Sequence, residues 1–95
     1  MQVVTIVRWP GMSTAQYDQL VDRMGWRDAP PAGGISHAAL VDGDDMVFVN
    51  LWQDRSAQEA FAAAAMPALE RAGIAPAEMA TYDVHNIVTA QGVAH

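Results

Sequence analysis

Two polar side chains, His37 and Asn50, lie inside apolar runs of the sequence and are the residues best suited to chemistry. Imidazole exchanges a proton near neutral pH, and an amide can hold a developing oxyanion. Together they could bind a phenolate or enolate and relay a proton. The same groups could instead satisfy each other as a structural pair, because buried polar groups need hydrogen-bond partners. Both interpretations stay open at the level of the sequence.

Large side chains that could enclose a flat ligand accompany this pair. They are Tyr17, Met24, Trp26, Phe48, Trp52 and Phe61. Aromatic rings stack on flat ligands and methionine adapts to irregular ones, but both types are also common in protein cores. We predict that these six residues line a substrate cavity between a sheet and its helices, with His37 and Asn50 as the catalytic residues.

The other histidines and the known motifs add little chemistry. His85 is expected on the last strand with Asp83 on the same face, but residues two apart on a strand are too distant for reliable contact. His95 is terminal. The chain has no cysteine and no metal-ligand spacing motif, and it has no Ser-His-Asp, phosphate-loop or dinucleotide fingerprint. We predict no metal and no cofactor.

The strands that would carry the polar pair form a predicted hairpin. Two apolar runs, 35–41 and 46–53, are separated by Asp-Gly-Asp-Asp, a strong hairpin signal. Symmetric pairing about that turn places His37 opposite Asn50 and Ile35 opposite Trp52. A bulge would change the face for one strand.

The N-terminal part predicts a strand followed by a helix. Residues 2–9 are rich in β-branched types and end at a Pro-Gly turn. Ser13 and Gln16 then form a capping box, Met12 and Tyr17 occupy the positions of a hydrophobic staple, and Gly25 stops the helix. The Pro- and Gly-rich segment 26–34 is a predicted loop.

The C-terminal part predicts a second helix and a last strand. Ser56 and Glu59 form another capping box, and Gly73 closes the helix. Pro67 should kink or break this helix near Ala63, because proline cannot donate to that carbonyl. The last strand is predicted over 80–89, and residues 91–95 are a predicted frayed tail.

The element order β-α-β-β-α-β predicts one α+β domain over residues 1–95. It is the ferredoxin-like split βαβ arrangement, a four-stranded antiparallel sheet with both helices on one face. The chain spends 52% of its 95 residues on apolar types, which is generous for a small domain with a bare sheet face. We therefore predict a homodimer through that sheet face.

Charge excludes several partners. The net charge is −6, the five basic residues are scattered arginines, and there is no lysine. Binding to nucleic acid or to an anionic membrane needs clustered cations, so neither is predicted. No apolar run approaches the roughly 20 residues that span a bilayer, and no signal peptide is recognised. The expected location is the cytoplasm.

The segment Asn50-Leu51-Trp52-Gln53-Asp54-Arg55-Ser56-Ala57-Gln58-Glu59-Ala60-Phe61 resembles the junction of third strand and second helix in the dimeric α+β barrel superfamily. Antibiotic-biosynthesis monooxygenase-like domains, including small uncharacterised actinobacterial members, are the most similar group. The chain length and the Val84-His85-Asn86 segment are also similar. In element order the resemblance covers nearly the whole chain.

This resemblance implies a small-molecule enzyme acting on a flat aromatic or polyketide-like substrate, of the cofactor-independent oxygenase or cyclase/isomerase type. Asn50 and Trp52 match residue types that hold phenolic substrates in the oxygenases of the group. Many members carry a histidine where this chain has Phe61, which argues against haem ligation. The alternative is a non-catalytic ligand-binding or accessory dimer, since one fold hosts many functions.

Overall fold

The strands and helices follow one another in the predicted β-α-β-β-α-β order. The computed structural model describes residues 1–26, 28–74, 76 and 78–90. Its elements are β1 (Val3–Trp9), α1 (Thr14–Met24), β2 (Gly34–Asp42), β3 (Asp45–Trp52), α2 (Arg55–Arg71) and β4 (Glu78–Asp83).

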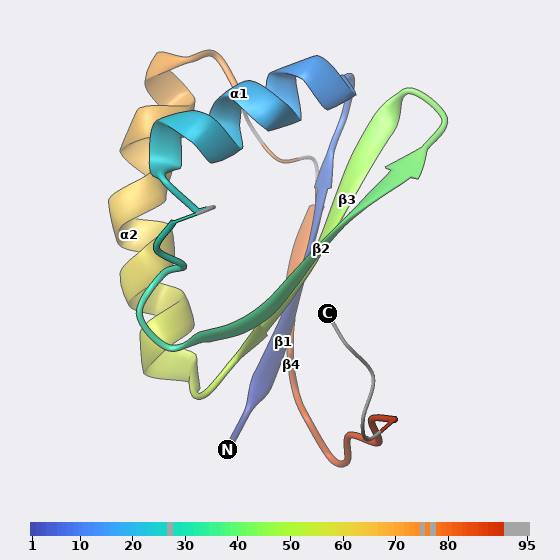
Figure 1. The fold of residues 1–95 in the computed structure, drawn as a ribbon, viewed down its shortest axis with the longest axis vertical. Helices are drawn as coiled ribbons and strands as arrows, with labels where there is room; N and C mark the ends of the chain where they lie inside the picture. Colours follow the sequence, from blue (N-terminus) through green and yellow to red (C-terminus); the bar gives the residue numbers. More distant parts are fainter. Residues whose placement is uncertain (27, 75, 77, 91–95) are drawn as a thin grey trace.

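The four strands form one antiparallel sheet in the order β2-β3-β1-β4, with both helices on one side of it (Figure 1). The core lies between the sheet and the helices, and it is built around Val7, Trp9, Met12, Met46, Phe48 and Leu69. The predicted α+β, ferredoxin-like fold is confirmed.

The opposite face of the sheet is apolar and partly exposed. Buried residues alternate along β1 toward the helices, so Val4 and Ile6 point the other way. Ile6, Leu40 and Tyr82 are 39%, 48% and 57% exposed. Neither helix of the described part of the chain has the length and apolar character of a membrane-spanning segment.

The predicted register of the β2–β3 hairpin is confirmed from its turn to Ser36. Asp42 pairs with Asp45, and His37 lies opposite Asn50. The predicted pairing of Ile35 with Trp52 is wrong, because a bulge between Gly34 and Ser36 places Gly34 opposite Trp52. The extra residue falls where the chain enters the strand from the glycine-containing loop, a common place for such an irregularity.

The start of α1 is as predicted. The Ser13 hydroxyl accepts from the Gln16 amide, and the Gln16 side chain accepts from the Ser13 amide. Gly25 ends the helix in the left-handed conformation at φ 71°, where a side chain would be strained. These two caps fix both ends of the helix that carries Tyr17 and Met24.

The predicted start of α2 is wrong, and so is a break at Pro67. Its N-cap is Asp54, whose carboxylate accepts from the Ala57 amide, so Ser56 does not start a capping box. The helix also continues without a break through Pro67. Both Pro67 and Ala63 lie on the exposed side of the helix. Water can therefore serve the Ala63 carbonyl that proline leaves without a donor.

The last strand is displaced from its predicted range. It runs from Glu78 to Asp83 and pairs only with β1, which begins at Val3. One further bond, from the Val84 amide to the Gln2 carbonyl, ends the pairing. His85 is therefore exposed beyond the strand, and the prediction that it lies on the strand is wrong. The predicted frayed tail, 91–95, lies outside the described residues.

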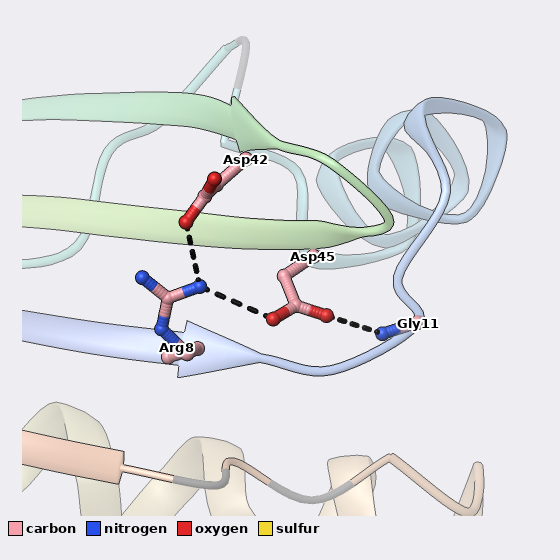
Figure 2. Close-up of polar contacts among 4 residues, drawn as sticks. All are labelled: Arg8, Gly11, Asp42 and Asp45. Carbon is pink, nitrogen blue, oxygen red and sulfur yellow. Dashed lines mark hydrogen bonds and ion pairs between the residues drawn. The ribbon is translucent and has the colours of Figure 1, made fainter.

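A small ionic cluster ties the hairpin to the first strand (Figure 2). The Arg8 guanidinium donates to Asp42 at 2.9 Å and to Asp45 at 3.1 Å. Asp45 also accepts from the backbone amide of Gly11 at 3.3 Å. The hydrogen bond to Asp42 and, to a smaller extent, the one to Asp45 raise the pKa of Arg8 above its usual value, so Arg8 stays charged. The cluster joins the tip of the hairpin to the turn after β1.

Replacing Asp45 with alanine should lower the melting temperature by a few degrees. The change removes an ion pair and a bond to the Gly11 backbone together, whereas Asp42→Ala removes only an exposed ion pair. Asp42→Ala is the matched control and should melt close to the parent chain. Equal melting temperatures for the two variants would show that the bond to Gly11 contributes nothing.

Candidate functional site

The predicted pairing of His37 and Asn50 across the hairpin is present as a hydrogen bond. Nδ1 of His37 lies 2.5 Å from Oδ1 of Asn50. A third residue joins them from α1, because the Tyr17 hydroxyl lies 2.8 Å from Nε2 of His37. The three side chains come from β2, β3 and α1, so the packing of helix on sheet assembles the site.

The chemistry of these groups gives the chain of hydrogen bonds a direction. A carboxamide oxygen can only accept, so Nδ1 of His37 carries the hydrogen. Neutral imidazole has one N–H, which leaves Nε2 as an acceptor for the Tyr17 hydroxyl. Asn50 thus selects the tautomer of His37 in which Nε2 is the base.

Aromatic rings surround His37. The Tyr17 ring stacks on the imidazole with a centroid separation of 5.8 Å and an interplanar angle of 13°. The Phe48 ring meets the imidazole edge-on, with a centroid separation of 5.0 Å. The ring centroid of Trp26 lies 5.5 Å from that of His37. Trp26 also contacts Phe61, and Phe61 packs against Trp52. The rings hold the imidazole plane in place, although the His37 residue itself remains exposed.

His37 and Asn50 face a cavity of about 310 Å³. Four of the six predicted substrate-binding residues line it with them: Tyr17, Trp26, Trp52 and Phe61. This volume is at the lower end of the range for small-molecule sites. The cavity is mainly apolar, has several aromatic rings in its wall and carries a few polar groups, as such sites usually do.

The loop between α1 and β2 completes the wall of this larger cavity with Pro30 and Pro31, and Gly34 follows them at the start of β2. Gly33 holds that loop against α2. Its φ is 79°, and a side chain there would collide with Ala57, so only glycine allows this close approach. The Gly33 carbonyl accepts from the Gln53 amide at 2.8 Å, which fixes the loop to the end of β3.

A smaller cavity of about 60 Å³ lies deeper between sheet and helices. The two remaining predicted residues, Met24 and Phe48, line this one. Four residues line both cavities: Trp26, Asn50, Trp52 and Phe61. The amide of Asn50 is therefore at the boundary between an outer and an inner space.

Two indole N–H groups at the smaller cavity are buried without an acceptor. Trp9 and Trp52 both line it, and among the described residues neither Nε1 has a hydrogen-bond partner. A buried donor without a partner costs about 1 to 3 kcal/mol.

Several residues at these cavities were not predicted from the sequence. Gln58 is only 8% exposed and lines the smaller cavity with Thr5 and Trp9. A signal was present for Gln58, since it falls on the same helical stripe as Phe61, Ala65 and Leu69. Ile35 and the two prolines at the larger cavity gave no comparable signal.

Among the described residues, no group of three or more His, Asp or Glu side chains lies close enough together to hold a metal ion. His85 is exposed at the far end of β4 and takes no part in the site.

No protein-family model matches the sequence, and no curated protein matches it significantly. Solved structures of the same fold are known. One, from Deinococcus radiodurans, is named as a candidate antibiotic biosynthesis monooxygenase; it is 13% identical, with a TM-score of 0.66 over 95% of this chain and 99% of its own. SnoaB from Streptomyces nogalater, a cofactor-independent oxygenase, is 17% identical. Its TM-score is 0.68 over 92% of this chain and 96% of its own.

A third similar structure, MupZ from Pseudomonas fluorescens, is 4% identical with a TM-score of 0.68 over 99% of this chain and 98% of its own. These identities establish the fold and not the activity. The resemblance that the strand-to-helix junction indicates is confirmed at that level: this chain has the fold of the antibiotic-biosynthesis monooxygenase-like proteins.

Proposed function

We propose that this chain is a small-molecule enzyme acting on a flat aromatic or polyketide-like substrate with an acidic hydroxyl. The reaction is of the cofactor-independent oxygenase type, or of the cyclase/isomerase type that begins with the same proton transfer. The catalytic residues are His37 and Asn50, and the aromatic residues around the larger cavity bind the substrate. Such an enzyme would belong to secondary metabolism.

The observation that carries the proposal is a base of fixed tautomer at the wall of an aromatic cavity. Asn50 holds His37 so that Nε2 is the acceptor, and both line the 310 Å³ space. Imidazole is the side chain best suited to take a proton near neutral pH. The likeness to SnoaB, itself a cofactor-independent oxygenase, supports this class of chemistry.

The reaction would proceed from the substrate anion. The hydroxyl proton passes to His37 and leaves an electron-rich ring. For the oxygenase, the anion gives electrons to dioxygen, a C–O bond forms at a ring carbon, and the resulting hydroperoxide loses water to leave a carbonyl. Dioxygen is the oxidant, and its second oxygen atom departs as water. For the cyclase or isomerase, the anion attacks or is reprotonated within the same molecule.

The protein would contribute positioning and electrostatic stabilisation. Trp26 and Phe61 offer faces for stacking, and the Asn50 amide can donate to the developing anion. The unpartnered indole groups of Trp9 and Trp52 favour a substrate that also carries a carbonyl or quinone oxygen. That oxygen would enter the smaller cavity.

A second candidate is a non-catalytic ligand-binding or accessory dimer. The observation in its favour is that Tyr17, His37 and Asn50 satisfy one another without a ligand. On that view the three residues are a structural network, and the cavity only stores or presents its ligand.

Oxygen uptake separates the two candidates. With the wild-type protein and a phenolic polyketide, an oxygen electrode should record consumption that scales with protein concentration. The methyl ether of the same compound is the matched control and should give none, because it has no hydroxyl proton to lose. Tight binding of both compounds without oxygen consumption, and without any rearranged product, would favour the accessory dimer.

A further inference from the structure

The Tyr17 hydroxyl stands between the His37 base and an incoming ligand. It donates to Nε2 at 2.8 Å, so the lone pair that would take a ligand proton is already engaged. Tyr17 and His37 both line the larger cavity. A ligand hydroxyl can therefore reach the base in two ways, by displacing Tyr17 or through its oxygen.

The surroundings of Tyr17 oppose displacement. The Tyr17 ring stacks on the His37 ring with an interplanar angle of 13°. It makes an edge-to-face contact with Phe48, with ring centroids 5.4 Å apart. Phe48 is 3% exposed and belongs to the core, so it cannot move aside cheaply. The Tyr17 amide donates to the Ser13 carbonyl in the first turn of α1, which the capping box secures. A swing of the Tyr17 side chain would lose the ring contacts with both His37 and Phe48, while α1 itself stays fixed.

We propose that Tyr17 accepts the proton of the ligand hydroxyl and passes its own proton to His37, an inference that rests on the proposed function. A phenolic oxygen that donates its hydrogen can still accept one. The ligand proton moves to Oη of Tyr17 as the Tyr17 proton moves to Nε2 of His37. The products are a ligand anion and an imidazolium whose Nδ1–H remains on Asn50. No electron is transferred and no co-reactant is needed.

Tyr17 is then a catalytic residue that touches the ligand, and it selects ligands. The relay requires a ring hydroxyl acidic enough to give its proton to a phenol bonded to imidazole. It also requires that this hydroxyl reach the wall formed by α1. Naphthols and hydroxylated polyketide rings meet both requirements, whereas unactivated alcohols do not.

Tyr17→Phe tests the relay, with Tyr82→Phe as the matched control. Tyr82 is the only other tyrosine; it lies on the sheet face of the predicted dimer, lines neither cavity, and keeps its ring in the variant. Three quantities are measured: kcat and KM for oxygen uptake, and the absorbance of bound naphthol against pH. For Tyr17→Phe, kcat should fall roughly 10²-fold with little change in KM, which is the scale of losing a proton-transfer group. Bound naphthol should stay neutral at pH values where the wild type holds the anion.

Two outcomes would overturn the relay while leaving the proposed function standing. A Tyr17→Phe variant with wild-type kcat and bound naphtholate would show that the ligand gives its proton directly to His37. A variant changed only in KM or melting temperature would show that the phenol serves packing. A wild-type protein that never ionises naphthol and turns over no phenolic polyketide would refute the proposed function, and the relay with it.

Discussion

Val49→Lys should convert a dimer into a monomer that melts at a much lower temperature. Val49 lies on a central strand, opposite Ile6 on one side and Ala38 on the other, in the middle of the apolar sheet face away from the helices. A charge buried there without a partner costs about 3 kcal/mol or more. Association should weaken by at least about 100-fold. Folding and association of obligate dimers are linked, so thermal stability falls as well.

The control for this prediction is Gln19→Lys, which adds the same charge at an exposed position on α1. Sedimentation velocity at micromolar concentration should give a dimer for the wild type and for Gln19→Lys, and a monomer for Val49→Lys. The dimer is inferred from the exposed apolar residues of that face, including Ile6 and Leu40. A wild-type protein that sediments as a stable monomer would contradict it.

Local patterns predicted the fold because each acts over a few residues. The capping box of Ser13 and Gln16, the glycine stop and the Asp-Gly turn all depend on nearby backbone groups, and all are found as expected. The register that places His37 opposite Asn50 follows from the turn alone. The resemblance at the strand-to-helix junction predicted the same fold.

Predictions that depend on distant partners were less accurate. The end of β4 is set by the start of β1, so the sequence around His85 could not reveal where pairing stops. Continuity of α2 through Pro67 depends on which side of the helix faces solvent. The bulge before Ser36 arises where the loop is held by α2.

In the candidate site too, local contacts were predictable from the sequence, whereas contacts between distant elements were not. The hydrogen bond between His37 and Asn50 was predictable from hairpin pairing, since both residues belong to one local unit. The bond from Tyr17 to His37 was not, because it depends on the position of α1 over the sheet. Tyr17 was predicted as a wall of the cavity, and its contact with the base emerges only from the packed structure.

Asn50→Leu should reduce turnover by roughly 10²–10³-fold while the protein stays folded. The change removes the acceptor that fixes the His37 tautomer and the amide that can donate to the anion. Because His37 is exposed, water can replace its lost partner, and the melting temperature should change little. On the structural interpretation, turnover should change little, because neither side chain takes part in the reaction. Asn86→Leu, the same substitution at an exposed position beyond β4, is the control.

The most direct test of a working base at this site is the absorbance of bound naphthol near neutral pH. It is recorded for the wild type and for Asn50→Leu, each below its own melting temperature. We predict that the wild type and the Asn86→Leu control hold the naphtholate anion. Asn50→Leu should bind the neutral form or none. Equal anion signals from the wild type and Asn50→Leu, or a neutral spectrum from both, would contradict the assignment of His37 and Asn50 as a catalytic pair.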